Sequence, residues 1–255
     1  MEAVFEKQME IRSFEADWSS RIRASVVLNY LQEAAVGHAR LRGISVQDMR
    51  RQQLFWVVSR FHLCMDRYAR SGETVTMRTW SSTRQEIFTC REFEMLDGVD
   101  EVMARATSSW ALLSMETRRP VPLDGNLPQF AIDERRVVVD DFVSLPELED
   151  GDYVRSFDVL RRDLDMNGHV NNAVYAEWAL ETVPQQVAGQ SRIAELEIGF
   201  RAEALYGETI DSRCKIEGNG GDTFIHRVCS GTDGRELARL RTSWGTFDSA
   251  TGRRA

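Results

Sequence analysis

The feature that most constrains this chain is that it contains a similar pattern twice. Residues 68–80 read YARSGETVTMRTW, and residues 203–215 read EALYGETIDSRCK. Farther along, residues 104–120 (ARATSSWALLSMETRRP) resemble residues 237–253 (LARLRTSWGTFDSATGR). Gly72 and Gly207 are 135 positions apart, and Trp110 and Trp244 are 134 apart, so two separate matches fall at nearly the same spacing. An internal repeat of this kind predicts two similar folded halves.

Each half is predicted to contain one long helix followed by several strands. Residues 26–41 have apolar side chains at helical spacing and end before Gly43. Residues 172–183 are also helical in pattern, with Asn172 as the predicted N-cap and Pro184 just beyond the end. The order, repeated twice, predicts an α+β fold with an antiparallel sheet wrapped around a helix in each half. The predicted strands cover residues 55–65, 73–80, 87–96, 102–113, 193–200, 208–218, 223–230 and 236–247.

A proline-rich segment separates the two halves. Residues 120–150 hold four of the five prolines and end in the acidic run ELEDGD. Such a segment is typical of a connection between domains. We therefore predict an N-terminal domain over residues 1–128, a linker over 129–150 and a C-terminal domain over 151–255.

Composition excludes several classes of protein. The chain of 255 residues is 42% hydrophobic and 28% charged, as expected for a soluble globular protein, and its net charge of −8 argues against general nucleic-acid binding. It has no apolar run of about 18 residues, so no membrane span is expected. It has no secretion signal at its start, so we expect a cytoplasmic location and no export. The four cysteines lack paired spacing, which predicts buried free thiols without a metal, and no cofactor is expected. Arginine pairs, of which a subset could dock an acidic partner, lie at Arg50-Arg51, Arg118-Arg119, Arg135-Arg136, Arg161-Arg162 and Arg253-Arg254.

The segment DLDMNGHVNN, residues 163–172, carries the densest chemistry. Asn-Gly favours a tight turn, and a predicted helix starts directly afterwards. Backbone N–H groups at that helix start would favour a developing negative charge. His169 titrates near neutrality and can relay a proton, while Asp165 could orient it or act as a base and Asn167 could orient a carbonyl or a water. This set suits the transfer of an acyl group from a thioester to water.

The alternative for this segment is a polar turn that only caps a helix, because Asx residues are common in such turns. The alternative weakens when the residues are taken together, since four side chains able to do acid–base or hydrogen-bond work fall within one short turn. The other histidines, His38, His62 and His226, lie on the first helix or inside strand-like runs. For these we expect ordinary packing or exposure.

With these residues in view, the sequence resembles the acyl-acyl-carrier-protein thioesterases that end fatty-acid synthesis in plants and many bacteria. The resemblance covers nearly the whole chain, including IRSFEADWSSRIRASVVLNYLQEAAVGHARLRG, LFWVVSRFHLCMDRY and DLDMNGHVNNAVYAEWALE. It implies two tandem hotdog domains, each a curved antiparallel sheet around a long central helix. It also implies hydrolysis of fatty acyl-acyl-carrier-protein thioesters, with the acyl carrier protein as partner.

The resemblance assigns the family's catalytic aspartate, asparagine and histidine to Asp165, Asn167 and His169. Its catalytic glutamate lies in a Tyr-Arg-Arg-Glu-Cys segment, which here reads Phe-Arg-Ala-Glu-Ala, so that role falls on Glu203. Where family members often have cysteine, this chain has Ala204. A covalent thiol route through that position is therefore closed, and attack by water assisted by Glu203, His169 and Asp165 remains.

The repeat also predicts that the two halves differ in function. At the repeat spacing Glu203 corresponds to Tyr68, and the residues before the first helix, SSRIRASVV, contain no Asp-x-Asn-x-His pattern. The first half is therefore expected to be non-catalytic and to shape an acyl pocket. Small residues on its helix, Ala34, Ala35 and Gly37, are predicted to leave room for an acyl tail.

Two other functions remain open at this point. One is a thioesterase of the same fold that acts on coenzyme A esters, since similar turns occur in such enzymes. The other is a non-catalytic module that binds acyl groups or carrier protein, although a binder needs no proton relay. The sequence does not decide between carrier-protein and coenzyme A esters, the acyl chain length, or the oligomeric state, for which a homodimer is one option.

Overall fold

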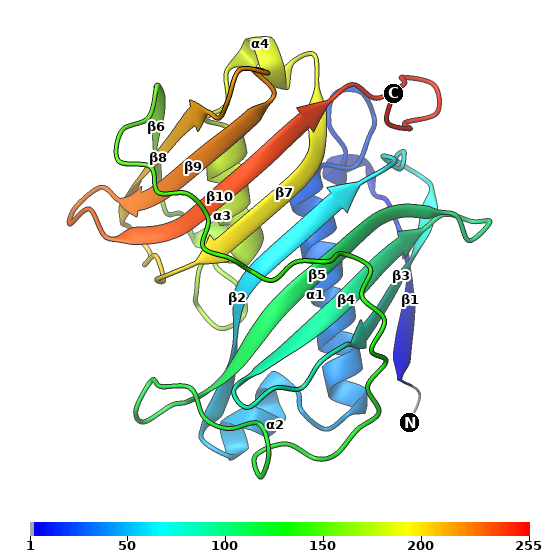
Figure 1. Cartoon of the computed structure of the whole chain (residues 1–255), viewed down its shortest axis with the longest axis vertical. Coiled ribbons are helices and arrows are strands. Elements are labelled where there is room, and N and C mark those ends of the chain that lie inside the picture. The colour runs from blue at the N-terminus through cyan, green and yellow to red at the C-terminus, as the bar shows by residue number, and fades with distance from the viewer. Residues whose placement is uncertain (1–2) are drawn as a thin grey trace. The chain divides into compact units, whose positions relative to one another are not determined.

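The computed structural model describes residues 3–255 and divides the chain into two compact units. Unit 1 comprises residues 1–23 and 29–142, and unit 2 comprises residues 24–28 and 143–255. Figure 1 colours the chain along its length and labels its elements. In chain order they are β1 (Val4–Glu10), η1 (Ser13–Glu15), α1 (Ala24–Leu41), α2 (Val46–Arg51), β2 (Leu54–Met65), β3 (Thr74–Ser81), β4 (Phe88–Leu96), β5 (Val102–Ser114), β6 (Tyr153–Asp158), η2 (Arg161–Asp163), α3 (Asn172–Leu180), α4 (Gln185–Ala188), β7 (Arg192–Phe200), β8 (Thr209–Ile216), β9 (Thr223–Ser230) and β10 (Glu236–Gly245).

The strands of unit 1 lie in the order β1-β3-β4-β5-β2, and those of unit 2 in the order β7-β10-β9-β8-β6. Neighbouring strands within each run are antiparallel. All eight predicted strands are present within two residues of their expected ends. The coarse expectation of antiparallel sheet with few helices is therefore confirmed.

Two strands were not predicted, and both lie at the end of a strand run. In β1, which pairs with β3, the side chains from Phe5 onward alternate between half-buried and exposed. In β6, which pairs with β8, five of six residues are exposed. Edge strands of this kind need few apolar side chains, so their sequences lack the strong pattern of the buried strands.

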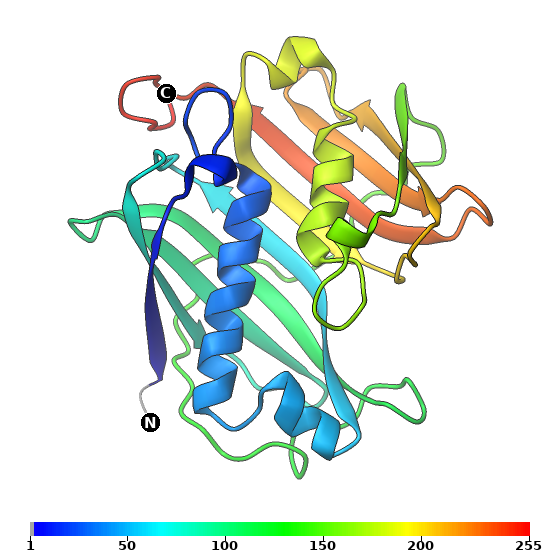
Figure 2. The same cartoon turned by 180° about the vertical axis from the view of Figure 1, so that it is seen from behind.

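Helix α1 runs along one face of the strands of unit 1, as Figure 2 shows. Its buried face includes Leu31, Ala34 and His38, at helical spacing. The prediction that Gly37 leaves room for a ligand is wrong, because Phe5 of β1 takes that space. A methyl group on Gly37 would lie 2.7 Å from the Phe5 ring. Gly37 is thus a site of close helix–strand packing.

Helix α3 packs against β8, β9 and β10 of unit 2. Its buried residues include Ala176, Trp178 and Ala179. The predicted N-cap is displaced by one residue, because Asn171 rather than Asn172 precedes the helix and its side chain accepts a hydrogen bond from the Ala173 N–H. The helix ends at Leu180, three residues earlier than expected. Either asparagine could cap the helix, so the sequence alone did not decide which of them does.

The repeat seen in the sequence is also present in the backbone. Gly72 and Gly207 have φ angles of +86° and +83°, a left-handed conformation that favours glycine. The Gly72 N–H donates to the carbonyl of Ile11, and the Gly207 N–H donates to that of Val159. In each unit, therefore, a glycine in the same conformation donates a hydrogen bond to the residue that directly follows β1 or β6.

Three further expectations concern membrane-spanning helices, the cysteines and the histidines of the described residues. None of their helices is both long and apolar enough to cross a membrane. The four cysteines are free thiols, and all but Cys64, which is half-buried, lie buried. His38, His62 and His226 all lie buried, which is one of the two outcomes, packing or exposure, that were expected for them.

Candidate active site

The turn before α3 is organised by the side chain of Asp165. One carboxylate oxygen accepts the N–H of Asn167 at 2.7 Å and the N–H of His169 at 3.1 Å. The Asp165 N–H in turn donates to the His169 carbonyl at 2.7 Å. Gly168 has a φ of +80°, which closes the turn at a position that favours glycine. Asp165 therefore fixes the backbone on which His169 is carried.

The second oxygen of Asp165 orients the neighbouring amide. The Asn167 side-chain nitrogen donates to this oxygen at 3.1 Å. Because the nitrogen points toward Asp165, the orientation of the amide group is determined, and with it the direction of the Asn167 carbonyl oxygen. The structure thus brings two of the four predicted residues into direct contact.

The other two predicted residues face each other across a short gap. Glu203 follows β7, and its carboxylate oxygen lies 3.8 Å from Nδ1 of His169. The His169 side chain is 49% exposed and that of Glu203 is 42% exposed. The distance exceeds that of a direct hydrogen bond, but it is short enough for a water or a reacting group to contact both side chains. Catalytic hydrogen bonds are often this long in the absence of substrate.

Tyr175, which the sequence analysis did not single out, holds the loop that carries Glu203. Its hydroxyl accepts the N–H of Ala204 at 2.9 Å. Burial raises the pKa of Tyr175 to about 12, and the nearby Glu203 charge adds to this, so the hydroxyl stays neutral. The sequence placed Tyr175 in the predicted helix over residues 172–183 but gave no signal for this contact. The position of Ala204, buried against this hydroxyl, offers no nucleophile.

Backbone N–H groups at the start of α3 were expected to be free to bind an anion, but two of them are already hydrogen-bonded. The Asn171 N–H donates to the Asp163 carbonyl at 2.8 Å. The Ala173 N–H donates to the Asn171 side chain at 3.0 Å. A helix start capped in this way has these donors already occupied.

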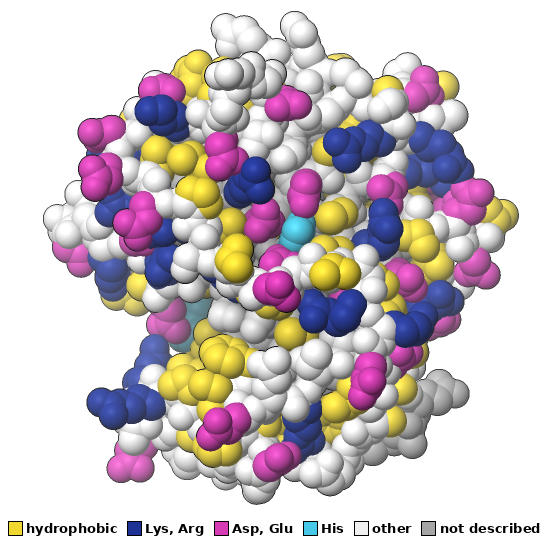
Figure 3. Space-filling view, in the orientation of Figure 1, with side chains coloured by type: hydrophobic (Ala, Val, Ile, Leu, Met, Phe, Trp, Pro, Cys, Tyr) yellow, Lys and Arg dark blue, Asp and Glu magenta, His cyan; other side chains and the backbone are white. Residues whose placement is uncertain are grey.

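Exposed apolar side chains lie within the turn and next to Glu203. Met166 is 83% exposed and Leu205 is 57% exposed. The guanidinium of Arg161 lies over the ring of Tyr206, 5.2 Å from its centre. Figure 3 shows hydrophobic, basic and acidic side chains interspersed over one face of the molecule. The site thus combines a carboxylate, an imidazole and an oriented amide with apolar and basic neighbours.

A turn with the same backbone precedes α1 in unit 1. Asp17 accepts the N–H of Ser19 at 2.8 Å and the N–H of Arg21 at 3.2 Å, and its own N–H donates to the Arg21 carbonyl at 2.8 Å. Ser20 has a φ of +60°, matching Gly168. Arg21 is buried and donates to the Tyr68 carbonyl at 2.8 Å. The sequence analysis found no Asp-x-Asn-x-His pattern here, but the turn itself is repeated as Asp-x-Ser-x-Arg.

Comparison with known proteins identifies the family. Residues 2–128 match the acyl-ACP thioesterase N-terminal domain and residues 147–246 the C-terminal domain. The dodecanoyl-[acyl-carrier-protein] hydrolase of Umbellularia californica is 30% identical over 94% of this chain and 67% of its own length. The chain therefore belongs to the acyl-ACP thioesterase family.

Related structures share the fold. The 12:0-ACP thioesterase of Umbellularia californica is 28% identical, with a TM-score of 0.82, and the match covers 96% of this chain and 98% of that one. An acyl-ACP thioesterase from Bacteroides thetaiotaomicron superposes with a TM-score of 0.86 at 24% identity, covering 95% and 98% of the two chains. A palmitoyl-acyl carrier protein thioesterase of Cuphea hookeriana is 30% identical over 94% of this chain, which spans 62% of that relative's length.

Proposed function

We propose that this protein hydrolyses fatty acyl-acyl-carrier-protein thioesters and releases the free fatty acid. The single observation that carries the proposal is the pairing of His169 with Glu203 beside the turn built on Asp165. A protein that only bound acyl groups would need no such arrangement of exposed acid and base. Membership of the acyl-ACP thioesterase family supports the same activity.

The proposed reaction uses the four residues in distinct roles. A water held between Glu203 and His169 attacks the thioester carbonyl carbon, and one of these two groups accepts the proton that the water gives up. Proton transfer through His169 to the departing sulfur releases the thiol as the carbon–sulfur bond breaks. Asn167 orients the carbonyl or the water through its positioned amide. Asp165 acts by holding the turn, since its contacts reach backbone N–H groups and Asn167.

We further propose that the fold is a tandem hotdog, with the central helices α1 and α3. Residues 1–128 form the non-catalytic domain, 129–150 the linker and 151–255 the catalytic domain. A cavity in unit 1 with Ala35 and Ala39 in its wall supports the prediction that the first domain receives the acyl tail. The carrier protein is proposed to dock beside the turn, where Arg161 and Arg162 offer positive charge to an acidic partner.

The test is hydrolysis of matched thioesters by the purified chain. A dodecanoyl group would be presented on acyl carrier protein and on coenzyme A, and release of free thiol would be followed. Faster turnover on the carrier protein supports the proposal. Preference for the coenzyme A ester would establish the alternative substrate, and no turnover of either ester by folded protein would leave only a binding role.

A further inference from the structure

Unit 1 contains two buried arginines that have no acidic partner among the described residues. Arg42, at the end of α1, is 4% exposed, and Arg91, on β4, is 8% exposed. Arg42 donates to the Ser81 hydroxyl at 2.9 Å and to the carbonyls of Ala3 and Ala131. Arg91 donates to Nδ1 of His38 at 3.0 Å and to the Thr79 hydroxyl at 3.2 Å. Buried charges are normally paired, so this pair requires an explanation.

The cluster carries two positive charges at neutral pH. Burial, assisted for Arg91 by its neighbour Arg42, lowers the pKa of Arg91 to about 9, and burial lowers that of Arg42 to about 10. Burial and both arginines lower the pKa of His38 to about 3, so this histidine stays neutral and accepts from Arg91. No neighbouring negative charge offsets the two guanidinium groups in the described structure.

The nearest acidic residue in sequence does not compensate Arg91. Glu92 follows it on β4 and points to the opposite face of the strand, as alternation along a strand requires. There the Glu92 carboxylate contacts Arg136 at 2.8 Å and the hydroxyls of Ser82 and Thr107. Each face of β4 therefore has its own polar cluster, and only one of them includes a carboxylate.

Donor groups in the arginine cluster remain available for a ligand. Both hydrogen bonds of Arg91 come from a single nitrogen, Nη1, although a guanidinium carries five N–H donors. The Nε of Arg42 is buried without a hydrogen-bond partner in the part of the chain that is described. Unsatisfied buried donors of this kind cost free energy unless a ligand accepts from them.

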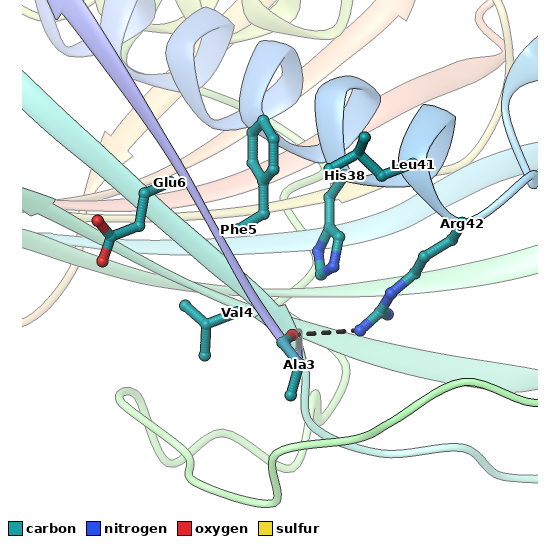
Figure 4. A pocket seen from close by; sticks show the side chains of 7 residues that line it. All are labelled: Ala3, Val4, Phe5, Glu6, His38, Leu41 and Arg42. Carbon is teal, nitrogen blue, oxygen red and sulfur yellow. Dashed lines mark hydrogen bonds between the residues drawn. The ribbon is translucent and has the colours of Figure 1, made fainter. Parts of the chain in front are cut away.

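Arg91 lies in the wall of a cavity that is otherwise mostly apolar. The cavity measures about 90 Å³, and its wall includes Ala35, Ile44, Trp56 and Trp110. Arg42 and His38 line a second hollow, of about 750 Å³, between the end of α1 and β1, and Glu6 also lies in its wall. Figure 4 shows His38 and Arg42 projecting from α1 on the same side of this hollow. In the smaller cavity positive charge thus meets apolar surface, which suits an amphiphile with an anionic head.

We propose that unit 1 holds a binding site for an aliphatic carboxylate, with Arg91 and Arg42 binding the carboxylate and the apolar cavity wall contacting the chain. A carboxylate matches the planar fork of a guanidinium and would supply the missing negative charge. Two sources share this chemistry: the fatty acid released by the reaction, or a carboxylate at the far end of an acyl chain. Which of these two sources applies depends on the proposed function, whereas the existence of the site does not depend on it.

The test is calorimetric titration of the intact protein with dodecanoate, dodecanol and inorganic phosphate. Wild-type protein should bind dodecanoate at least about tenfold more tightly than dodecanol, because charge-assisted hydrogen bonds add to the apolar contact. Phosphate, which has no chain, should bind more weakly than dodecanoate. Equal binding of dodecanoate and dodecanol, or tighter binding of phosphate, would overturn the proposal.

Variants separate the arginine cluster from general effects of charge. Arg91→Met should abolish the preference for dodecanoate over dodecanol. Arg105→Met is the matched control, because Arg105 lies on neighbouring β5 in an exposed pair with Asp66 and should keep the preference. An unchanged preference in folded Arg91→Met protein would contradict the proposal. If that variant does not fold, the wild-type titration already decides, and Arg42→Met provides a second variant.

Kinetics distinguish the two sources of the carboxylate. If the ligand is the released acid, dodecanoate should inhibit hydrolysis by wild-type protein and inhibit the Arg91→Met variant at least about tenfold less. If the carboxylate belongs to the acyl chain, a thioester with a terminal carboxylate should be preferred by wild-type protein only. The titrations require no turnover, so carboxylate binding by an inactive protein would refute the proposed function and leave the site standing.

Discussion

The turn before α3 and the turn before α1 have the same backbone conformation, but the last residue of the turn is half exposed before α3 and buried before α1. In both, one oxygen of an aspartate accepts the N–H groups two and four residues ahead, from Asp165 in one case and Asp17 in the other. In the second unit the last residue, His169, has a half-exposed side chain near Glu203. In the first unit Arg21 is buried and bonded to the Tyr68 carbonyl.

The two turns together distinguish the aspartate that shapes the backbone from the side chains that are proposed to react. Because the aspartate serves the same backbone purpose in both units, its presence alone indicates structure rather than catalysis. The two positions that change, His169 against Arg21 and Glu203 against Tyr68, are those to which the proposed mechanism gives acid–base chemistry. We therefore propose that the exposed pair reacts and that Asp165 supports that pair.

The largest expected effect comes from His169→Ala. Loss of a general acid–base group should lower kcat/KM by roughly 10²–10⁴-fold, while the fold remains, since the side chain is half exposed. Thiol release from acyl-carrier thioester would be measured alongside circular dichroism. Wild-type turnover by folded protein would remove His169 from the mechanism.

Replacing the two aspartates sharpens the comparison further. Asp165→Ala and Asp17→Ala should each lower the free energy of unfolding by roughly 1–2 kcal/mol, because each removes hydrogen bonds to two backbone N–H groups. Only Asp165→Ala should also reduce turnover by more than about tenfold. Denaturant unfolding and steady-state kinetics provide the two readouts. Equal losses of activity would show that the turns do not differ in function.

Exchanging the residues at positive φ tests the shared backbone alone. Gly168→Ser should lower the free energy of unfolding by about 1 kcal/mol, because a side chain is disfavoured in the left-handed region. Ser20→Gly should change stability in the opposite direction by less than about 1 kcal/mol, since relief of strain is offset by the entropy of glycine. Thermal melts of both variants would show the signs. Shifts of the same sign would contradict a common turn.

The smallest expected effect is that of removing every thiol. Burial raises the pKa of Cys214 to about 12, so this thiol is not a ready nucleophile. A variant with Cys64, Cys90, Cys214 and Cys229 replaced by alanine should keep turnover within a few-fold if it folds. Loss of activity in folded protein would restore a thiol mechanism in place of water attack.

Much of the fold was predictable, because its signals are local. Buried strands such as β2 and β9 carry alternating or continuous apolar residues, and these were recognised. The edge strands β1 and β6 were missed because exposed strands need no apolar pattern. Helix α1 was predicted within two residues at its start, whereas the cap of α3 was assigned to Asn172 instead of Asn171.

The site was predictable only where its residues are close in sequence. The turn from Asp165 to His169 forms one motif, and the resemblance to a family supplied Glu203. The repeated turn at Asp17 was missed because backbone hydrogen bonds, rather than residue identity, define it. The pairing of Arg42 with Arg91 was also missed, since these residues come from distant segments and share no local pattern.

The central claim is that the second unit alone carries the reacting groups, and one pair of variants tests it most directly. Glu203→Gln and Tyr68→Phe change equivalent positions of the two units by a single polar group each. The account predicts that kcat/KM on acyl-carrier thioester falls by roughly 10²–10⁴-fold for Glu203→Gln and stays within a few-fold for Tyr68→Phe. Similar losses in both folded variants, or wild-type turnover by Glu203→Gln, would contradict it.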